Sequence, residues 1–92
     1  MRLTLLTASD VQHDLAGAVR QRRREQKLSR AALAERSGVP APTIKRFETT
    51  GQISLRQFLL LWQSVDRLEP IAELTAPRPT MPRSIEEVLR DE

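Results

Sequence analysis

The segment from Leu28 to Gly51 constrains the fold more strongly than any other part of this 92-residue chain. Ser29 is a good cap for a helix over residues 30–37, because a serine oxygen accepts a hydrogen bond from an amide of the first turn that lacks a helical partner. Gly38 ends that helix well, because glycine tolerates the left-handed backbone found there. A second helix is expected over about 41–49. The segment therefore predicts two short helices joined by a tight turn.

Three further helices are expected around this pair. The Ser9–Gln12 segment fits a capping box that opens the first helix near Ser9, and Ser54–Gln57 opens another over about 55–66. A short fifth helix is expected over about 69–75. The predicted inward positions, taken from apolar residues at helical spacing, are Val11, Leu15, Ala18, Val19, Leu33, Ala34, Ile44, Phe47, Leu55, Phe58, Leu59, Trp62 and Val65.

The two ends of the chain differ from this helical body in composition. Residues 1–8 are expected to form an extended segment, with a weak alternation at Leu3–Leu6 that suits a short strand. Residues 77–92 contain several prolines and then acidic residues, which predicts a Pro-rich linker and a short helical tail. The fold class is therefore all-α, with one domain over residues 9–76.

Positive charge is concentrated in one part of the chain. From Ala18 to Arg46 there are nine Lys or Arg residues and two acidic residues, a net charge of +7, whereas the segment from Asp66 to Glu92 has a net charge of −3. A polyanionic partner such as nucleic acid would favour this asymmetry. A solvated helical face is the alternative explanation, because charge runs on helices are often simply exposed to water.

Composition excludes several classes of function. The chain has no cysteine, so disulfides and thiolate metal sites are ruled out and a cytoplasmic location is expected. His13 is the single histidine, and it lacks both the carboxylates of a zinc site and the serine of a catalytic set. No apolar run approaches the roughly 20 residues that cross a bilayer, and the opening MRLTLL is too short for a signal peptide. We therefore expect no catalytic residue, no metal, no cofactor and no membrane contact.

A pair of short helices with a basic second helix has the layout of the helix-turn-helix motif. In that motif the second helix lies in the major groove of DNA and the first crosses the backbone. One such helix covers only a few base pairs, so useful specificity requires two copies. The layout predicts double-stranded DNA as the partner and a homodimer as the binding form. The candidate dimer surfaces are the fifth helix, with Ile71 and Leu74, and the Leu3–Leu6 segment; Trp62 is expected in the core or in the dimer interface.

A spaced combination of residues runs through this region, namely Leu28, Ser29, Leu33, Ala34, Gly38, Val39, Ile44, Glu48 and Gly51. The combination resembles the Cro and lambda-repressor-like (XRE) family of helix-turn-helix proteins over about residues 11–75. This resemblance implies a compact five-helix lambda-repressor-like domain that binds DNA as a symmetric dimer. It also implies an ion pair between Arg23 and Glu48, as in some members. The alternative for Arg23 is one more surface arginine in an Arg-Arg-Arg run.

The resemblance assigns DNA contacts to two groups of residues. Ser29 and Arg30 match positions that contact the backbone, where free amides and the helix dipole also favour a phosphate. Thr49 and Thr50, just after the second helix of the pair, match loop positions that touch phosphate. The positions that read bases are Ala41, Pro42, Thr43, Lys45 and Arg46.

Two positions depart from the family pattern. Many members have Gln or Ser at the first reading positions, where this chain has Ala41 and Pro42, and neither side chain can hydrogen-bond to a base edge. Direct readout must then depend on the other three reading residues, whose hydroxyl, ammonium and guanidinium groups suit base edges, with either modest discrimination or a contribution from DNA shape. Lys27 stands where relatives often have a glycine that closes the preceding helix.

The leading interpretation is a transcriptional repressor that binds an inverted-repeat operator as a homodimer. The small format with a tail further resembles the HipB-like antitoxins of HipBA-like or HipBST-like operons, which repress their own operon and pair with a HipA-like Ser/Thr kinase toxin. The acidic tail favours a protein partner, and a solvated tail is the alternative. A prophage-type repressor, a restriction-modification controller, or an interaction module that has lost DNA binding are the other interpretations.

Overall fold

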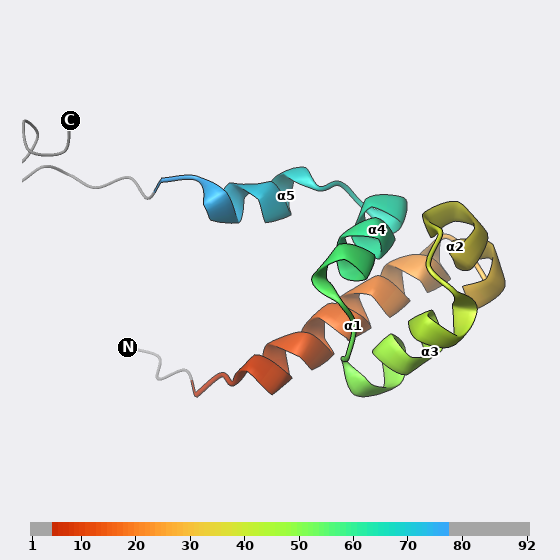
Figure 1. The fold of residues 1–92 in the computed structure, drawn as a ribbon, viewed down its shortest axis with the longest axis horizontal. Coiled ribbons are helices and arrows are strands. Elements are labelled where there is room, and N and C mark those ends of the chain that lie inside the picture. Colours follow the sequence, from red (N-terminus) through yellow and green to blue (C-terminus); the bar gives the residue numbers. More distant parts are fainter. Residues whose placement is uncertain (1–4, 78–92) are drawn as a thin grey trace, which may run out of the picture.

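The computed structural model describes residues 5–77, and within that range the chain is helical, as expected (Figure 1). Five α-helices and one turn of 3-10 helix account for the regular structure of these residues, which include no strand. The all-α fold class is confirmed. The helices are α1 (Ala8–Glu25), α2 (Arg30–Ser37), α3 (Ala41–Thr50), α4 (Leu55–Val65) and α5 (Glu69–Ala72), and the 3-10 turn spans Glu73–Thr75.

The cap of α1 is Thr7, two residues before the predicted one. The Thr7 hydroxyl accepts a hydrogen bond from the Asp10 amide at 3.1 Å, and the Asp10 carboxylate accepts one from the Thr7 amide at 3.1 Å. These reciprocal bonds form a capping box in which aspartate takes the place usual for glutamate or glutamine. The predicted cap at Ser9 is wrong, because Ser9 already lies in the first turn of the helix.

The ends of α2 are closed as predicted, and its bounds match the expected ones. Ser29 Oγ accepts a hydrogen bond from the Ala32 amide at 3.0 Å, and Gly38 has a φ of +79°, in the left-handed region. α3 has Pro42 in its first turn, ends at Thr50 and is capped by Gly51, which also has a positive φ of +77°. It is one residue longer than predicted.

The buried face of α4 differs from the prediction at two positions. Leu55 is 73% exposed, although the apolar pattern placed it inside, whereas Leu61 is fully buried and was not in the predicted set. Leu55 is the first residue of the helix, one turn before the buried residues, so it lies at the edge of the core rather than in it. The four buried residues keep the i, i+3, i+4, i+7 spacing of one helical face and are Phe58, Leu61, Trp62 and Val65.

The buried face of α1 also starts later than predicted. Val11 is exposed, and the buried residues are Ala16, Val19 and Arg23. The N-terminal end of α1 reaches beyond the neighbouring helices (Figure 1), so its first turn has fewer side chains to pack against. The expected position of Val11 in the core is therefore wrong.

The core forms where the first four helices meet. α1 packs against α3 and α4, and α2 packs against the same two helices. Phe47 and Phe58 meet edge to face with ring centroids 5.9 Å apart, a favourable aromatic geometry. Trp62 is buried beside Phe58, and its indole N–H donates to the Arg67 carbonyl at 2.8 Å. Trp62 is therefore a core residue.

The fifth helix lies at the edge of the bundle of α1–α4 and extends away from it (Figure 1). Leu68 and Ile71 are half-buried and pack against the edge of the core, whereas Leu74 is 83% exposed. The resemblance implied a compact five-helix domain. In the described residues, four helices form the compact part and the fifth extends from it.

The two ends of the chain fall largely outside the described residues. Residues 5–7 lead into α1 without regular structure, and both Leu5 and Leu6 are exposed, so the described part of the Leu3–Leu6 segment is not a strand. The linker and helical tail predicted over 77–92 lie outside the described residues apart from Pro77. Of the helices in the described part, none combines the length and apolar character needed to cross a membrane.

Candidate nucleic-acid interface

α2 and α3 form one unit because their inner sides are anchored in the core. Leu33 of α2, Val39 of the turn and Ile44 of α3 are each at most 1% exposed. Burial of these three side chains fixes the angle between the two helices, so the outer sides of both helices are left for polar and charged residues. The expected helix-turn-helix layout is present.

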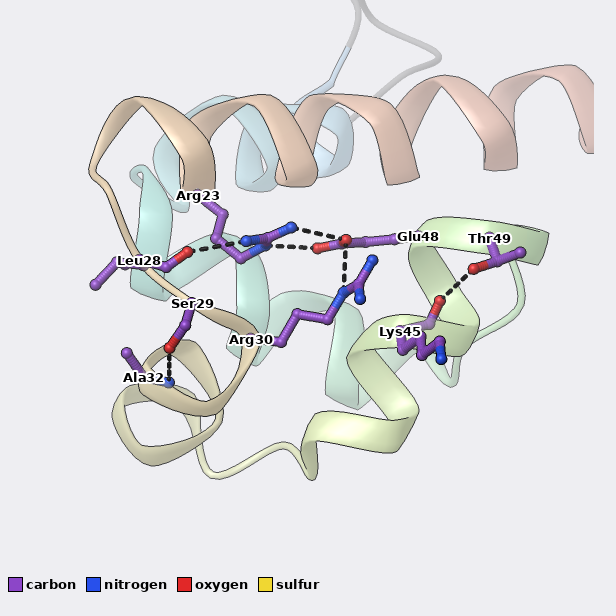
Figure 2. Close-up of polar contacts among 8 residues, drawn as sticks. All are labelled: Arg23, Leu28, Ser29, Arg30, Ala32, Lys45, Glu48 and Thr49. Atoms are coloured by element: carbon purple, nitrogen blue, oxygen red, sulfur yellow. Dashed lines mark hydrogen bonds and ion pairs between the residues drawn. The ribbon is translucent and has the colours of Figure 1, made fainter.

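Arg23 of α1 and Glu48 of α3 form a two-point ion pair behind this unit (Figure 2). Arg23 Nε lies 2.7 Å from Glu48 Oε2, and Arg23 Nη2 lies 3.0 Å from Glu48 Oε1. The remaining nitrogen, Nη1, donates to the Leu28 carbonyl at 2.9 Å. Arg23 is buried. The implied ion pair is therefore confirmed, and the interpretation of Arg23 as a surface arginine is wrong.

Arg30, which was predicted to contact the DNA backbone, shares the same carboxylate. Its Nε donates to Glu48 Oε1 at 3.1 Å, and its side chain is 37% exposed. The ion pair with Glu48 therefore directs the Arg30 side chain from the start of α2 toward α3 (Figure 2), and part of that side chain remains exposed to solvent.

The Glu48 side chain is only 1% exposed, and its carboxylate faces two cations. Burial by itself would raise the pKa of Glu48, but the hydrogen bonds from Arg23 and Arg30 outweigh it and hold the pKa below its usual value. Glu48 is therefore ionised in the folded protein at neutral pH, and it links α1, α2 and α3.

Three of the predicted base-reading residues line one groove beside α3. Pro42, Thr43 and Arg46 form one side of a groove of about 470 Å³ whose other side is formed by residues 52–54 and the start of α4. Arg46 is exposed, and its Nη2 donates to Gln52 Oε1 at 3.0 Å. A cation with a defined direction thus lies on the outer side of α3.

The other two predicted base-reading residues lie outside this groove. Lys45 is exposed on α3 (Figure 2), and Ala41, the first residue of the helix, is half-buried. Lys45 is therefore accessible to a partner as a single positive charge, and Ala41 offers only part of a small apolar surface.

Thr49 and Thr50 lie inside the last turn of α3, not in the loop after it. The Thr49 hydroxyl donates to the Lys45 carbonyl at 2.7 Å, and the Thr50 hydroxyl donates to the Arg46 carbonyl at 2.7 Å. Both side chains are exposed. Their hydroxyl protons are thus used within the helix, which corrects the expected position of these residues in a loop.

The basic segment Ala18–Arg46 is partly neutralised within the protein. Arg22 lies 2.7 Å from Asp66 and 4.6 Å from the ring centroid of Trp62, so it fastens α1 to the end of α4. Arg23 and Arg30 pair with Glu48, as described above. Three of the nine basic side chains of this segment therefore form intramolecular ion pairs. The net charge of the segment thus overstates the positive charge that is available to bind a partner.

Sequence reasoning missed Gln52, Ser54 and Gln57 as members of this surface. All three line the groove opposite Arg46. Ser54 and Gln57 were recognised only as a capping box for α4. Ser54 does cap the helix, since its Oγ accepts from the Gln57 amide at 3.2 Å, but the Gln57 side chain accepts from the Ser54 hydroxyl at 3.3 Å rather than from the Ser54 amide, so only half of the predicted box is present. The sequence signal that could have indicated these residues is their position shortly after α3, the second helix of the motif.

Comparison with protein families matches residues 14–75 to a family described as a helix-turn-helix domain. The matched range covers α2 and α3 completely, together with most of α1 and all of α4 and α5. Comparisons with curated proteins and with solved structures gave no match.

Proposed function

The chain belongs to the helix-turn-helix domain family, and we propose that it is a transcriptional repressor that binds an inverted-repeat operator as a homodimer. It acts through DNA binding and catalyses no reaction. The observation that carries this proposal is the outer side of α3, where Arg46 and Lys45 are both exposed on a helix whose inner side is anchored by Ile44 and Phe47.

The proposed contacts fall into two classes. Ser29 and Arg30 at the start of α2 contact phosphates, because the helix N-terminus and the guanidinium both attract an anion. Thr49 and Thr50 contribute hydroxyl oxygens at the end of α3. Base edges are read by α3, with Lys45 and Arg46 as donors to guanine, Thr43 as a hydroxyl partner, and Ala41 and Pro42 as apolar contacts to thymine methyl groups.

The double variant Lys45→Ala/Arg46→Ala tests this assignment. The measurement is binding of the full chain to the duplex upstream of its own gene, at two salt concentrations, with a scrambled duplex beside it. Each lost bidentate base contact should cost about 1–3 kcal/mol, and each lost phosphate contact should reduce the salt slope by about one unit. Both residues are exposed, so the variant should remain folded.

The matched control is Arg20→Ala/Arg24→Ala, which removes the same charge from exposed positions on α1. It should weaken binding much less than the α3 variant does. Equal losses in the two double variants would mean that generic charge, not the α3 surface, holds the DNA. Unchanged affinity in the α3 variant would contradict the proposed role of that helix.

We further propose that the repressor is the antitoxin of a HipBA-like or HipBST-like operon, with a HipA-like Ser/Thr kinase as its partner. The support is the net charge of −3 over Asp66–Glu92, which contrasts with the basic motif and suits a protein partner. Co-expression with the product of the adjacent gene tests this. A kinase that co-purifies with the full chain, and is lost when residues 78–92 are deleted, supports the antitoxin role, whereas no association contradicts it.

The homodimer requires an exposed apolar surface, and the described residues offer one where α4 meets α5. A groove of about 350 Å³ there is lined almost entirely by apolar atoms. It includes Ile71 and Leu74, the fifth-helix residues that the sequence indicated. The residues along the groove are Leu55, Leu59, Leu68, Ile71, Ala72, Leu74 and Thr75.

A further inference from the structure

Arg46 and Gln52 are connected by a closed set of hydrogen bonds at the end of α3. The Arg46 carbonyl accepts from the Thr50 hydroxyl at 2.7 Å, and Thr50 Oγ accepts from the Gln52 amide at 3.1 Å. The Gln52 side chain then accepts from Arg46 Nη2 at 3.0 Å. Backbone and side chain of Arg46 are thus both connected to Gln52.

The backbone before Gln52 is fixed independently of these bonds. Gly51 is buried with a φ of +77°, and a methyl group added to it would lie 3.2 Å from the main chain of Gln12 in α1. The close approach to α1 sets the path of the chain at residue 51. The Gln52 side chain therefore starts from a fixed backbone position, although the side chain itself is exposed.

We propose that Gln52 is a positioning residue that sets base specificity by fixing the direction of the Arg46 guanidinium over the groove beside α3. This inference rests on the proposed function. Gln52 occupies one N–H direction of the guanidinium, and the donors that remain are enough for a bidentate contact to guanine O6 and N7. Since the arginine is already ordered before DNA binds, less side-chain entropy is lost on binding.

A role in stability does not account for this contact. Both side chains are exposed and neither packs in the core, so this hydrogen bond is not needed to hold the helices together. The neighbouring residues Thr43, Ser54 and Gln57 line the same groove. The guanidinium is therefore held at the polar side of α3, where a base edge in the major groove would meet it.

The first step of the test is selection from a pool of randomised DNA duplexes with the full wild-type chain. An enriched sequence supplies a selected duplex, and its scrambled counterpart serves as the non-specific probe. No enrichment would overturn the proposed function, and the role of Gln52 with it. Enrichment leaves the role of Gln52 to be decided separately by variants.

The decisive variants are Gln52→Met, which keeps the length but removes the acceptor, Arg46→Ala, and the two combined. Gln52→Met should weaken binding to the selected duplex by about two- to ten-fold, as expected for losing the ordering of one long side chain. It should leave binding to the scrambled duplex unchanged. In the Arg46→Ala background it should have no further effect.

The matched control is Gln63→Met, the same change at an exposed position of α4 that does not line this groove. It should bind both duplexes as the wild type does. A loss on Gln52→Met that is equal for both duplexes, or that persists in the Arg46→Ala background, would overturn the positioning role while leaving the repressor proposal standing.

Discussion

Arg23 and Glu48 are 25 positions apart in the sequence, and they form a buried two-point ion pair in which the Glu48 side chain is 1% exposed. The pair joins α1 to α3, and Arg30 brings α2 to the same carboxylate at 3.1 Å. One acidic side chain thus fixes the three helices that carry the candidate interface. Neutralising Glu48 would leave Arg23 as a buried charge without a counterion.

Replacing Glu48 should therefore be strongly destabilising. Glu48→Ala should lower the free energy of unfolding by about 3 kcal/mol or more, the range seen when one partner of a buried ion pair is removed. Urea unfolding at neutral pH measures this. Glu35→Ala is the control, because Glu35 is an exposed glutamate on α2, and its removal should change stability by less than about 0.5 kcal/mol. Similar values for the two variants would contradict the structural role of Glu48.

The same carboxylate should make stability depend on pH. The pKa of Glu48 is lowered in the folded state, so its ionised form stabilises the fold above the pKa of an unfolded glutamate, about 4.3. That contribution is lost as the pH falls through the lowered value. The stability gap between wild type and Glu48→Gln, which cannot titrate, should shrink as the pH falls below about 4.3. A gap that stays constant over this range would contradict the linkage.

The parts of the fold that the sequence predicts well are those governed by local chemistry. Ser29 and Gly38 fixed both ends of α2, because a cap and a left-handed glycine act within one turn of the chain. The features that the sequence predicts wrongly are those that depend on how other helices pack over a residue. Leu55 keeps the helical spacing of the buried face, yet it lies at the edge of the core, and that edge is set by packing rather than by periodicity.

The candidate site shows the same division. The exposed side of α3 follows from its helical spacing, so Lys45 and Arg46, to which the resemblance assigns base contacts, are exposed as expected. The contact between Arg46 and Gln52 was not, because it depends on how the chain turns after Gly51 and packs against α1. Arg23 lies in a run of three arginines that resembles a solvated face, and only the resemblance to a family indicated its partner.

Lys27 should be replaceable by glycine with a gain in stability. It has a φ of +56°, the one positive value among the non-glycine residues of the described range, and left-handed backbone costs an L-residue about 1–2 kcal/mol. Part of the gain is offset by the greater freedom of glycine in the unfolded chain, so Lys27→Gly should raise the free energy of unfolding by about 0.5–1 kcal/mol. Lys27→Ala controls for loss of the charge, since alanine keeps the backbone strain, and it should give no gain. Equal effects of the two variants would mean that charge, not conformation, dominates at this position.

The dimer surface can be identified with two substitutions of the same kind. Leu74 is 83% exposed beyond α5 and Leu5 is 87% exposed before α1, so neither contributes much to the fold of one chain. If the apolar groove of α4 and α5 is the interface, Leu74→Glu buries an unpaired charge on association and should weaken the dimer at least about ten-fold, while Leu5→Glu should leave it intact. Sedimentation equilibrium of the wild type and both variants over a range of concentrations measures this. If only Leu5→Glu dissociates the dimer, the interface lies in the N-terminal segment instead. A wild-type chain that stays monomeric at every concentration would contradict the homodimer itself, because a symmetric operator needs two copies of α3 held at a fixed spacing.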